Sequence, residues 1–309
     1  MPLLDIGAAL ALGLRYFTII YLTGLGGLFS ERSGIVNIGL EGMLIVGTVM
    51  GAWGDVQFGP IAGLLIGAGG GLLFSLIHAV ATVTFRVDHI VSGVVINVVA
   101  IGLARFLSQL FFGQATQSDP GIPHLGTIDV PLLSDIPLGL GRAFQGMSPV
   151  VLVAFAVTIP AIFVLNRTRF GLRLRSAGEN PEAARTLGVR VAPLRYAGVM
   201  VSGTLGGLAG AFLAIEINGL FREGQTQGLG FIALAALILG NWQPLRLMAG
   251  ALLFGFATAV PLRIDIPGVP EQFVRMIPYI VTIIAIAGFV GRVQPPAAAG
   301  KAYEGGGAT

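Results

Sequence analysis

The chain has 309 residues, of which 54% are hydrophobic and 11% are charged, and its formal net charge at pH 7 is +3. Ordinary globular proteins carry about 25% charged residues. The composition therefore excludes a soluble domain and predicts an all-α, polytopic bundle of transmembrane helices in a lipid bilayer. The small net charge gives no indication of nucleic-acid binding.

Residue counts also exclude several kinds of site. The chain has no cysteine, and its three histidines are not spaced as metal ligands. The single lysine, Lys301, follows Gly300 but precedes Ala302, so the ATP-binding P-loop motif is incomplete. Because paired acids are missing too, we expect no catalytic site, no metal and no cofactor in this chain.

Stretches of about 17–25 mostly apolar residues predict membrane spans. In chain order the candidates are Ile6–Leu28, Ile35–Ala52, Pro60–Phe85, Ile90–Phe112, Pro149–Leu165, Tyr196–Ile217, Phe231–Gly240, Leu247–Val260 and Phe273–Phe289. The seventh and eighth candidates are short, so they form either two tilted spans or one broken, re-entrant element. The pattern favours about nine spans, within a range of eight to ten, in a transmembrane domain over residues 1–294. Residues 295–309 are rich in Ala and Gly and are predicted to be a disordered tail.

The few charges are distributed unevenly between the two sides of the membrane. With residues 166–195 in the cytoplasm, twelve Arg and Lys fall on that side and three, Arg142, Arg222 and Arg263, fall outside. The positive-inside rule then predicts an N-terminus outside and a cytoplasmic C-terminus.

The loop over residues 166–195 contains the signals of a short helix. Asn180 is a suitable N-cap, Pro181 occupies the first helical position, Glu182 lies in the first turn and Gly188 ends the helix. A two-turn helix is not stable alone in water, so it must dock on its own bundle or on a partner. The loop is therefore either an ordinary solvated positive loop or a lever that sits in a groove of a cytoplasmic motor protein.

Four stretches resemble one family of transporters. Glu182-Ala183-Ala184 followed by Gly188 is similar to the E-A-A-x-x-x-G core of ABC importer permeases, although the later I-x-L-P part of that motif is missing. Ser33–Gly42, Ser92–Asn97 and Gly228–Leu245 are similar to stretches of nucleoside and simple-sugar permeases. Branched-chain amino-acid permeases typically show N-L-A-x-G in the second span and ribose permeases D-L-S-x-G, and Asn37–Gly42 departs from both. The chain thus resembles ABC importer permeases of the superfamily that carries branched-chain amino acids, ribose and nucleosides. Within that superfamily it is most similar to the nucleoside (simple-sugar) branch.

The resemblance implies a function and a set of partners. The chain would be the ABC-permease-fold subunit of a bacterial importer in the cytoplasmic membrane, moving nucleosides by alternating access, with ATP hydrolysis on a separate ATPase. The implied partners are that ATPase, a second permease (a paralogue or the same chain) and an extracytoplasmic substrate-binding lipoprotein. The implied coupling helix to the ATPase consists of Asn180, Pro181, Glu182, Ala183, Ala184, Arg185 and Gly188.

Two kinds of alternative stay open. The solute could be a simple sugar or a branched-chain amino acid, as in other members of the superfamily. The chain could instead be a stand-alone secondary transporter, which predicts internal repeats and midplane ion ligands that the sequence does not show.

Polar residues inside the predicted spans are candidates for the translocation path or its gate. Glu41, His78 and Asn97 are expected about 10 Å from the cytoplasmic surface, as one polar belt, and Asn37 lies four residues before Glu41 on the same helical face. They either line the path or form an interhelical hydrogen-bond network. Glu216, at the outer end of the sixth span, is a candidate for the mouth of the path. Glycines spaced four apart, such as Gly67 and Gly71 or Gly203 and Gly207, predict close helix packing.

Overall fold

The computed structural model describes residues 6–131, 133–135, 140–262, 270–274, 276–289 and 293–303. Over these residues it is helical, apart from turns, irregular segments and two isolated β-bridges. The α-helices are α1 (Ile6–Arg32), α2 (Leu40–Phe58), α3 (Pro60–Ala79), α4 (His89–Phe112), α5 (Pro149–Ala156), α6 (Thr158–Arg167), α7 (Arg169–Glu179), α8 (Pro181–Thr186), α9 (Val191–Phe212), α10 (Leu229–Leu239), α11 (Pro244–Ala259), α12 (Glu271–Val274) and α13 (Ile277–Phe289). Two π-helical segments, Val80–Thr84 and Leu213–Asn218, extend α3 and α9, and 3-10 turns lie at Leu140–Phe144 and Val260–Leu262.

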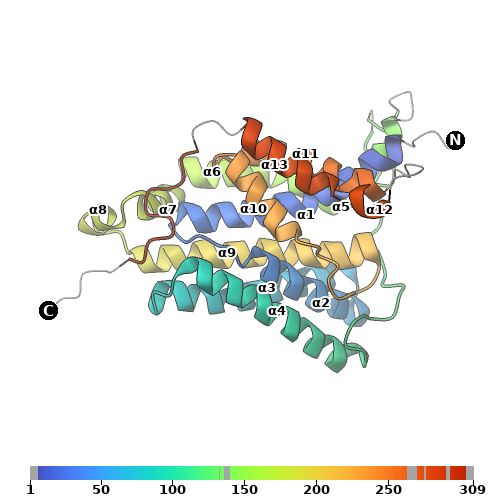
Figure 1. The fold of residues 1–309 in the computed structure, drawn as a ribbon, viewed down its shortest axis with the longest axis horizontal. Coiled ribbons are helices and arrows are strands. Elements are labelled where there is room, and N and C mark those ends of the chain that lie inside the picture. The colour runs from blue at the N-terminus through green and yellow to red at the C-terminus, as the bar shows by residue number, and fades with distance from the viewer. Residues whose placement is uncertain are drawn as a thin grey trace.

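The long helices lie side by side in one bundle, with α7 and α8 at one end and α12 at the other (Figure 1). Among the described residues, six helical segments are long and apolar enough to cross a membrane. They are Gly7–Arg32, Pro60–Thr84, His89–Phe112, Pro149–Arg167, Val191–Asn218 and Pro244–Leu262. The predicted all-α, multi-pass class is therefore confirmed, whereas the predicted nine spans stay a prediction. The predicted second span, α2, is 19 residues long but is not among the six, and it carries Glu41 and Asp55.

The centre of the bundle is built on glycine. Gly67 and Gly71 of α3 face Gly203 and Gly207 of α9 so closely that a Cβ added at Gly207 would collide with the Gly67 carbonyl. Small residues let helix backbones approach in this way. The predicted glycine seams are thus real contacts, and they hold α3 and α9 together as a rigid pair.

Two helices begin inside the bundle after a non-helical segment. Ser33–Gly39 separates α1 from α2, with Gly34 in the left-handed region at φ +98°. The loop after Asn218 leads to α10, whose 11 residues span only about 16 Å. Figure 1 shows α10 inclined between the long helices. The short seventh segment is therefore a half-helix, and its polar backbone ends need partners within the protein.

The predicted tail behaves differently from the expectation of disorder. Residues 293–303 pack on the end of the bundle that carries α7 and α8, and residues 304–309 lie outside the described part. Ala298 N–H donates to the Gly178 carbonyl at 2.8 Å, and Gly300 N–H donates to the Gly34 carbonyl at 3.2 Å. Small Ala and Gly side chains let this backbone approach closely enough to bond to the bundle.

Candidate translocation cavity and coupling helix

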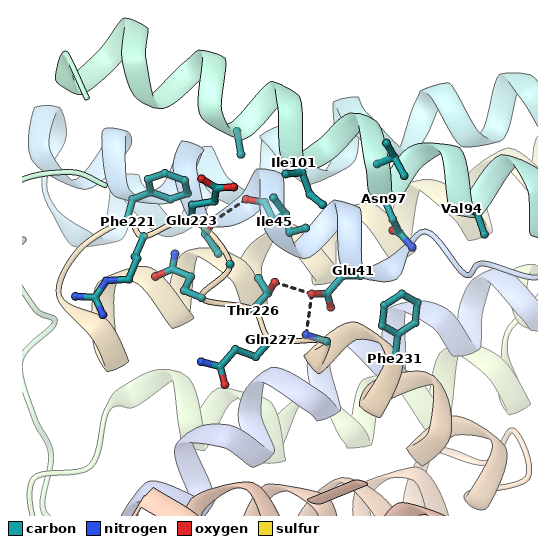
Figure 2. A pocket seen from close by; sticks show the side chains of 17 residues that line it. Glu41, Ile45, Val94, Asn97, Ile101, Phe221, Glu223, Thr226, Gln227 and Phe231 are labelled. Atoms are coloured by element: carbon teal, nitrogen blue, oxygen red, sulfur yellow. Dashed lines mark hydrogen bonds between the residues drawn. The ribbon is translucent and has the colours of Figure 1, made fainter. Parts of the chain in front are cut away.

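A cavity of about 490 Å³ lies between α2, α4 and the segment that leads into α10 (Figure 2). Its size is within the range of about 300–1,000 Å³ that is usual for small-molecule sites. Apolar side chains such as Ile45, Val98 and Ile101 form most of its wall. Polar groups enter from Glu41 and Asn97 and from residues 222–227. The cavity can therefore hold a small solute against an apolar wall with a few directed hydrogen bonds.

Glu41 is a buried carboxylate that serves as the cap of a neighbouring helix. Its Oε1 accepts hydrogen bonds from the Thr226 hydroxyl at 2.5 Å and the Gly228 N–H at 3.0 Å. Its Oε2 accepts one from the Gly230 N–H at 2.7 Å. The unpaired N–H groups and the dipole at a helix N-terminus favour a negative charge there. The beginning of α10 is thus the partner of the buried Glu41 carboxylate (Figure 2).

Asn97 caps α2 in the same manner. Its Oδ1 accepts from the Gly42 N–H at 2.7 Å, and its Nδ2 donates to the Ile38 carbonyl at 3.0 Å. A chain of caps therefore runs from α4 to α2 and from α2 to α10, and it surrounds one side of the cavity.

The other predicted polar residues do not line this cavity. Asn37 Nδ2 donates to the Ser202 hydroxyl of α9 at 2.9 Å. The His78 ring lies between the Ser92 hydroxyl, at 2.8 Å, and the Val36 carbonyl, at 3.3 Å. Both side chains are buried and hold residues 36–37 in place.

Glu216 lies elsewhere in the bundle, where its Oε1 accepts from the Leu125 N–H at 2.6 Å. Of the five candidate path residues, the structure thus brings only Glu41 and Asn97 to the cavity.

Several cavity residues were not expected from the sequence. Phe231 of α10 is 47% exposed and borders the cavity. Gln225 Oε1 accepts from Asn218 at 2.9 Å, but its buried Nε2 has no partner among the described residues. Arg105 and Glu223 form an ion pair at the rim. The sequence carried one signal for these residues: a glycine, Gly228, stands directly before an apolar run that is too short to span a membrane, as at the start of a half-helix. In the structure Gly228 adopts φ +80°.

The far end of α10 is also fixed by α1. Trp242 Nε1 donates to Glu31 at 2.6 Å, and Arg32 donates to the Trp242 carbonyl at 2.7 and 3.1 Å. Both ends of the half-helix are therefore held by residues that flank the break between α1 and α2.

The predicted coupling helix is α8, at one end of the bundle (Figure 1). Asn180 Oδ1 accepts from the Ala183 N–H at 3.0 Å, as expected of an N-cap, and Gly188 adopts φ +79°. Ala184 is buried, whereas Glu182 pairs with Arg185 at 3.5 Å on the exposed side. The helix ends at Thr186, one residue before Leu187, where the sequence predicts its last residue.

Two features around α8 were not expected. The preceding stretch forms a helix of its own, α7, whose Thr168 side chain accepts from the Gly171 N–H. Leu187, directly after α8, is 84% exposed. An exposed leucine beside a charged helix face is a surface that a partner can cover.

The fold defines a multi-pass membrane protein with a cavity beside the half-helix α10. Comparison with known proteins gives the family: residues 9–286 match the permease component of branched-chain amino acid transport systems, and the chain belongs to that family. Members of this family are transport subunits, so the chain is a permease and not an enzyme.

The chain is similar to permeases of named ABC transporters. The nucleoside ABC transporter permease protein NupC of Lactococcus lactis is 45% identical over 94% of both chains. The guanosine ABC transporter permease protein NupQ of Bacillus subtilis is 44% identical over 94% of both. The putative glucose ABC transporter permease protein TsgC13 of Haloferax volcanii is 34% identical over 80% of this chain and 74% of its own.

Proposed function

We propose that this chain is the membrane permease subunit of an ABC importer for nucleosides. The observation that carries the proposal is the cavity beside the start of α10, in a chain 45% identical over nearly its whole length to a nucleoside permease. ATP hydrolysis belongs to a partner ATPase, and solute is delivered by an extracytoplasmic binding lipoprotein. A second permease, either a paralogue or the same chain, completes the membrane part.

The chemistry of the cavity suits a neutral solute with an aromatic base. The Glu41 carboxylate accepts from three donors, Glu223 is paired with Arg105, and Arg222 is the other charged residue of the described lining. An amino acid would need unpaired groups of both charges, whereas a nucleoside needs hydrogen bonds and a ring to stack on. Phe231 supplies a ring face and the free Gln225 Nε2 supplies a donor. Figure 2 shows Phe231 across the cavity from Asn97 and Val94.

We propose separate roles for the polar residues. Glu41 and Asn97 hold the half-helices that form the gate, and an exchange of their capping bonds opens or closes the path. Asn37 and His78 keep the break between α1 and α2 in place, and Glu216 holds the outer loop near the mouth. Each role follows from the partners described above.

The helix α8 and its flanking residues Asn180–Gly188 would couple the bundle to the ATPase on the cytoplasmic side, with the N-terminus outside and the C-terminus inside. Leu187 and Glu182 supply the exposed apolar and acidic groups that an ATPase groove would receive.

The decisive experiment reconstitutes the permease with its ATPase, second permease and lipoprotein in proteoliposomes. We expect ATP-dependent accumulation of labelled nucleosides, and no accumulation by this chain alone. Preferential uptake of glucose, ribose or leucine would replace the proposed solute. Uptake by this chain alone, driven by a proton gradient, would instead show a secondary transporter.

The coupling role has its own test in the same liposomes. Leu187→Asp and Glu182→Lys are expected to abolish uptake while the protein still inserts, because both change only the exposed surface of α8. Leu187→Met keeps an apolar side chain and serves as the matched control. Normal uptake and normal ATPase stimulation in Leu187→Asp would remove the proposed contact.

A further inference from the structure

A second cavity, of about 280 Å³, lies at the end of the bundle that carries α7 and α8. It lies where α1 and α6 end and α11 begins, beside the turn between α10 and α11. Its lining includes Arg32, Asn166, Arg175, Trp242, Gln243 and Leu245. It is separate from the cavity beside Glu41, because the described linings of the two cavities have no residue in common.

The charges around this second cavity are unbalanced. Two guanidinium groups, Arg32 and Arg175, line it, and its described lining contains no Asp or Glu. The Nε of Arg175 is buried and has no hydrogen-bond partner among the described residues. Arg32 lies 3.8 Å from Glu179, a carboxylate that is itself 52% exposed. Charges that are largely removed from water are normally paired, and these two partly buried arginines share one half-exposed acid at the edge of ion-pair distance, so the site calls for a further anion.

The remaining wall of the cavity is apolar and opens toward the outside of the bundle. Leu245 of α11 is 57% exposed, and Ile162 of α6 lies beside it in the lining. On α6, the exposed apolar surface continues to Ile159, 74% exposed, and Phe163, 59% exposed. An apolar helix surface of this kind is the part of a membrane protein that lipid chains cover.

We infer that this cavity binds the phosphate of an anionic phospholipid, whose acyl chains follow the exposed surface of α6. The two guanidiniums supply charge-assisted hydrogen bonds to the phosphate. The exposed Asn166 and Gln243 amides lie at the same site, where they can donate to the glycerol oxygens. The arginine-rich loop belongs to this end, which the positive-inside rule places at the cytoplasmic leaflet, where anionic lipids gather.

The bound lipid would stabilise the turn that ends α10. Trp242 forms part of the cavity wall, and it is bonded to Glu31 and Arg32. A phosphate between Arg32 and Arg175 would offset the repulsion of these cations and hold Arg32 against the Trp242 carbonyl. This inference concerns lipid and is independent of the transported solute.

Native mass spectrometry of the full-length chain in non-ionic detergent tests the inference directly. The probes are phosphatidylglycerol and phosphatidylcholine with the same acyl chains. We expect preferential retention of phosphatidylglycerol, and Arg175→Gln should weaken that retention about tenfold or more, because it removes a charge-assisted hydrogen bond. Arg173→Gln makes the same change on the same helix outside the cavity and should retain the lipid. Equal retention in the two variants, or equal retention of the two lipids, would overturn the inference.

A second variant keeps the test valid if Arg175→Gln folds poorly. Gln243→Glu places a carboxylate beside the two arginines and should replace the lipid phosphate. We expect it to unfold at a higher temperature than the lipid-free native chain and to gain no further stability from phosphatidylglycerol. Continued stabilisation by phosphatidylglycerol would contradict the proposed site. Full stabilisation of the native chain by inorganic phosphate alone would assign the site to a soluble phosphate instead of a lipid.

Discussion

The α3–α9 pair and the α4–α10 region are built by different means. Between α3 and α9, backbone meets backbone at Gly67, Gly71 and Gly207, with no room for a Cβ. Around the cavity, α4 is buried along only one face, and it contacts α2 through the Asn97 cap. Close packing cannot slide without a steric collision, whereas capping hydrogen bonds can exchange partners. The first region is suited to be a scaffold and the second to be the part that moves.

The largest effect is expected from filling the glycine seam. Gly207→Ala places a methyl group against the Gly67 carbonyl, so both helices must shift. We expect a loss of about 3 kcal/mol or more in the free energy of unfolding, measured by denaturation of the purified chain. Gly69→Ala is the control, because no described atom lies within 4 Å of its added Cβ. Equal stability of the two variants would show that the seam is not the scaffold.

Removal of the Glu41 cap should act next most strongly. Glu41→Ala leaves the Gly228 and Gly230 N–H groups and the Thr226 hydroxyl without their acceptor. We expect a loss of about 2 kcal/mol in stability and at least a tenfold loss of uptake. Glu41→Gln keeps one carbonyl acceptor and should fall between Ala and the native chain. Native-like uptake by Glu41→Ala would mean that α10 needs no cap to form the path.

Substitution of Phe231 tests the contact with the solute without changing the α3–α9 scaffold. Because the ring is half exposed, Phe231→Ala should change stability little. Base stacking on an aromatic ring contributes about 1–3 kcal/mol, so the KM for nucleoside uptake should rise about tenfold. Phe231→Leu keeps apolar bulk without the ring and should resemble Ala, whereas Phe231→Tyr should resemble Phe. An unchanged KM in both Ala and Leu variants would exclude stacking at this residue.

The smallest effect is expected at the other end of α10. Trp242→Phe removes the bond to the buried Glu31 but keeps the backbone bond from Arg32. We expect a loss of about 1 kcal/mol, measured by thermal unfolding, and uptake close to native. Trp53→Phe, a tryptophan stacked on Phe111 far along the chain, controls for loss of an indole ring. A Trp242→Phe loss of uptake as large as that of Glu41→Ala would mean that both ends of α10 gate the path.

Much of the fold was readable from local patterns. Apolar runs predicted the helical bundle, four-residue glycine spacing predicted the close seams, and the capping signals at Asn180 and Gly188 placed α8 to within one residue. These features depend on neighbours within a few positions along the chain. The docked residues 293–303 could not be foreseen, because their backbone bonds go to Gly34 and Gly178, far away in sequence.

The sequence by itself determined that this protein is a membrane permease with one short, capped helix in its most arginine-rich loop, because composition and local signals suffice for both. Only the tertiary structure decided what the buried polar residues do. Glu41 was a candidate for the path or for an interhelical network, and its partners are the N–H groups at the start of a half-helix, the first of them 187 residues away. His78 shared its predicted depth but not its cavity, and Asn37, predicted on the same helical face as Glu41, bonds to Ser202 of α9 instead. The depth of a side chain in the membrane follows from its position along a helix. Its hydrogen-bond partners follow from how the broken helices meet in the folded bundle.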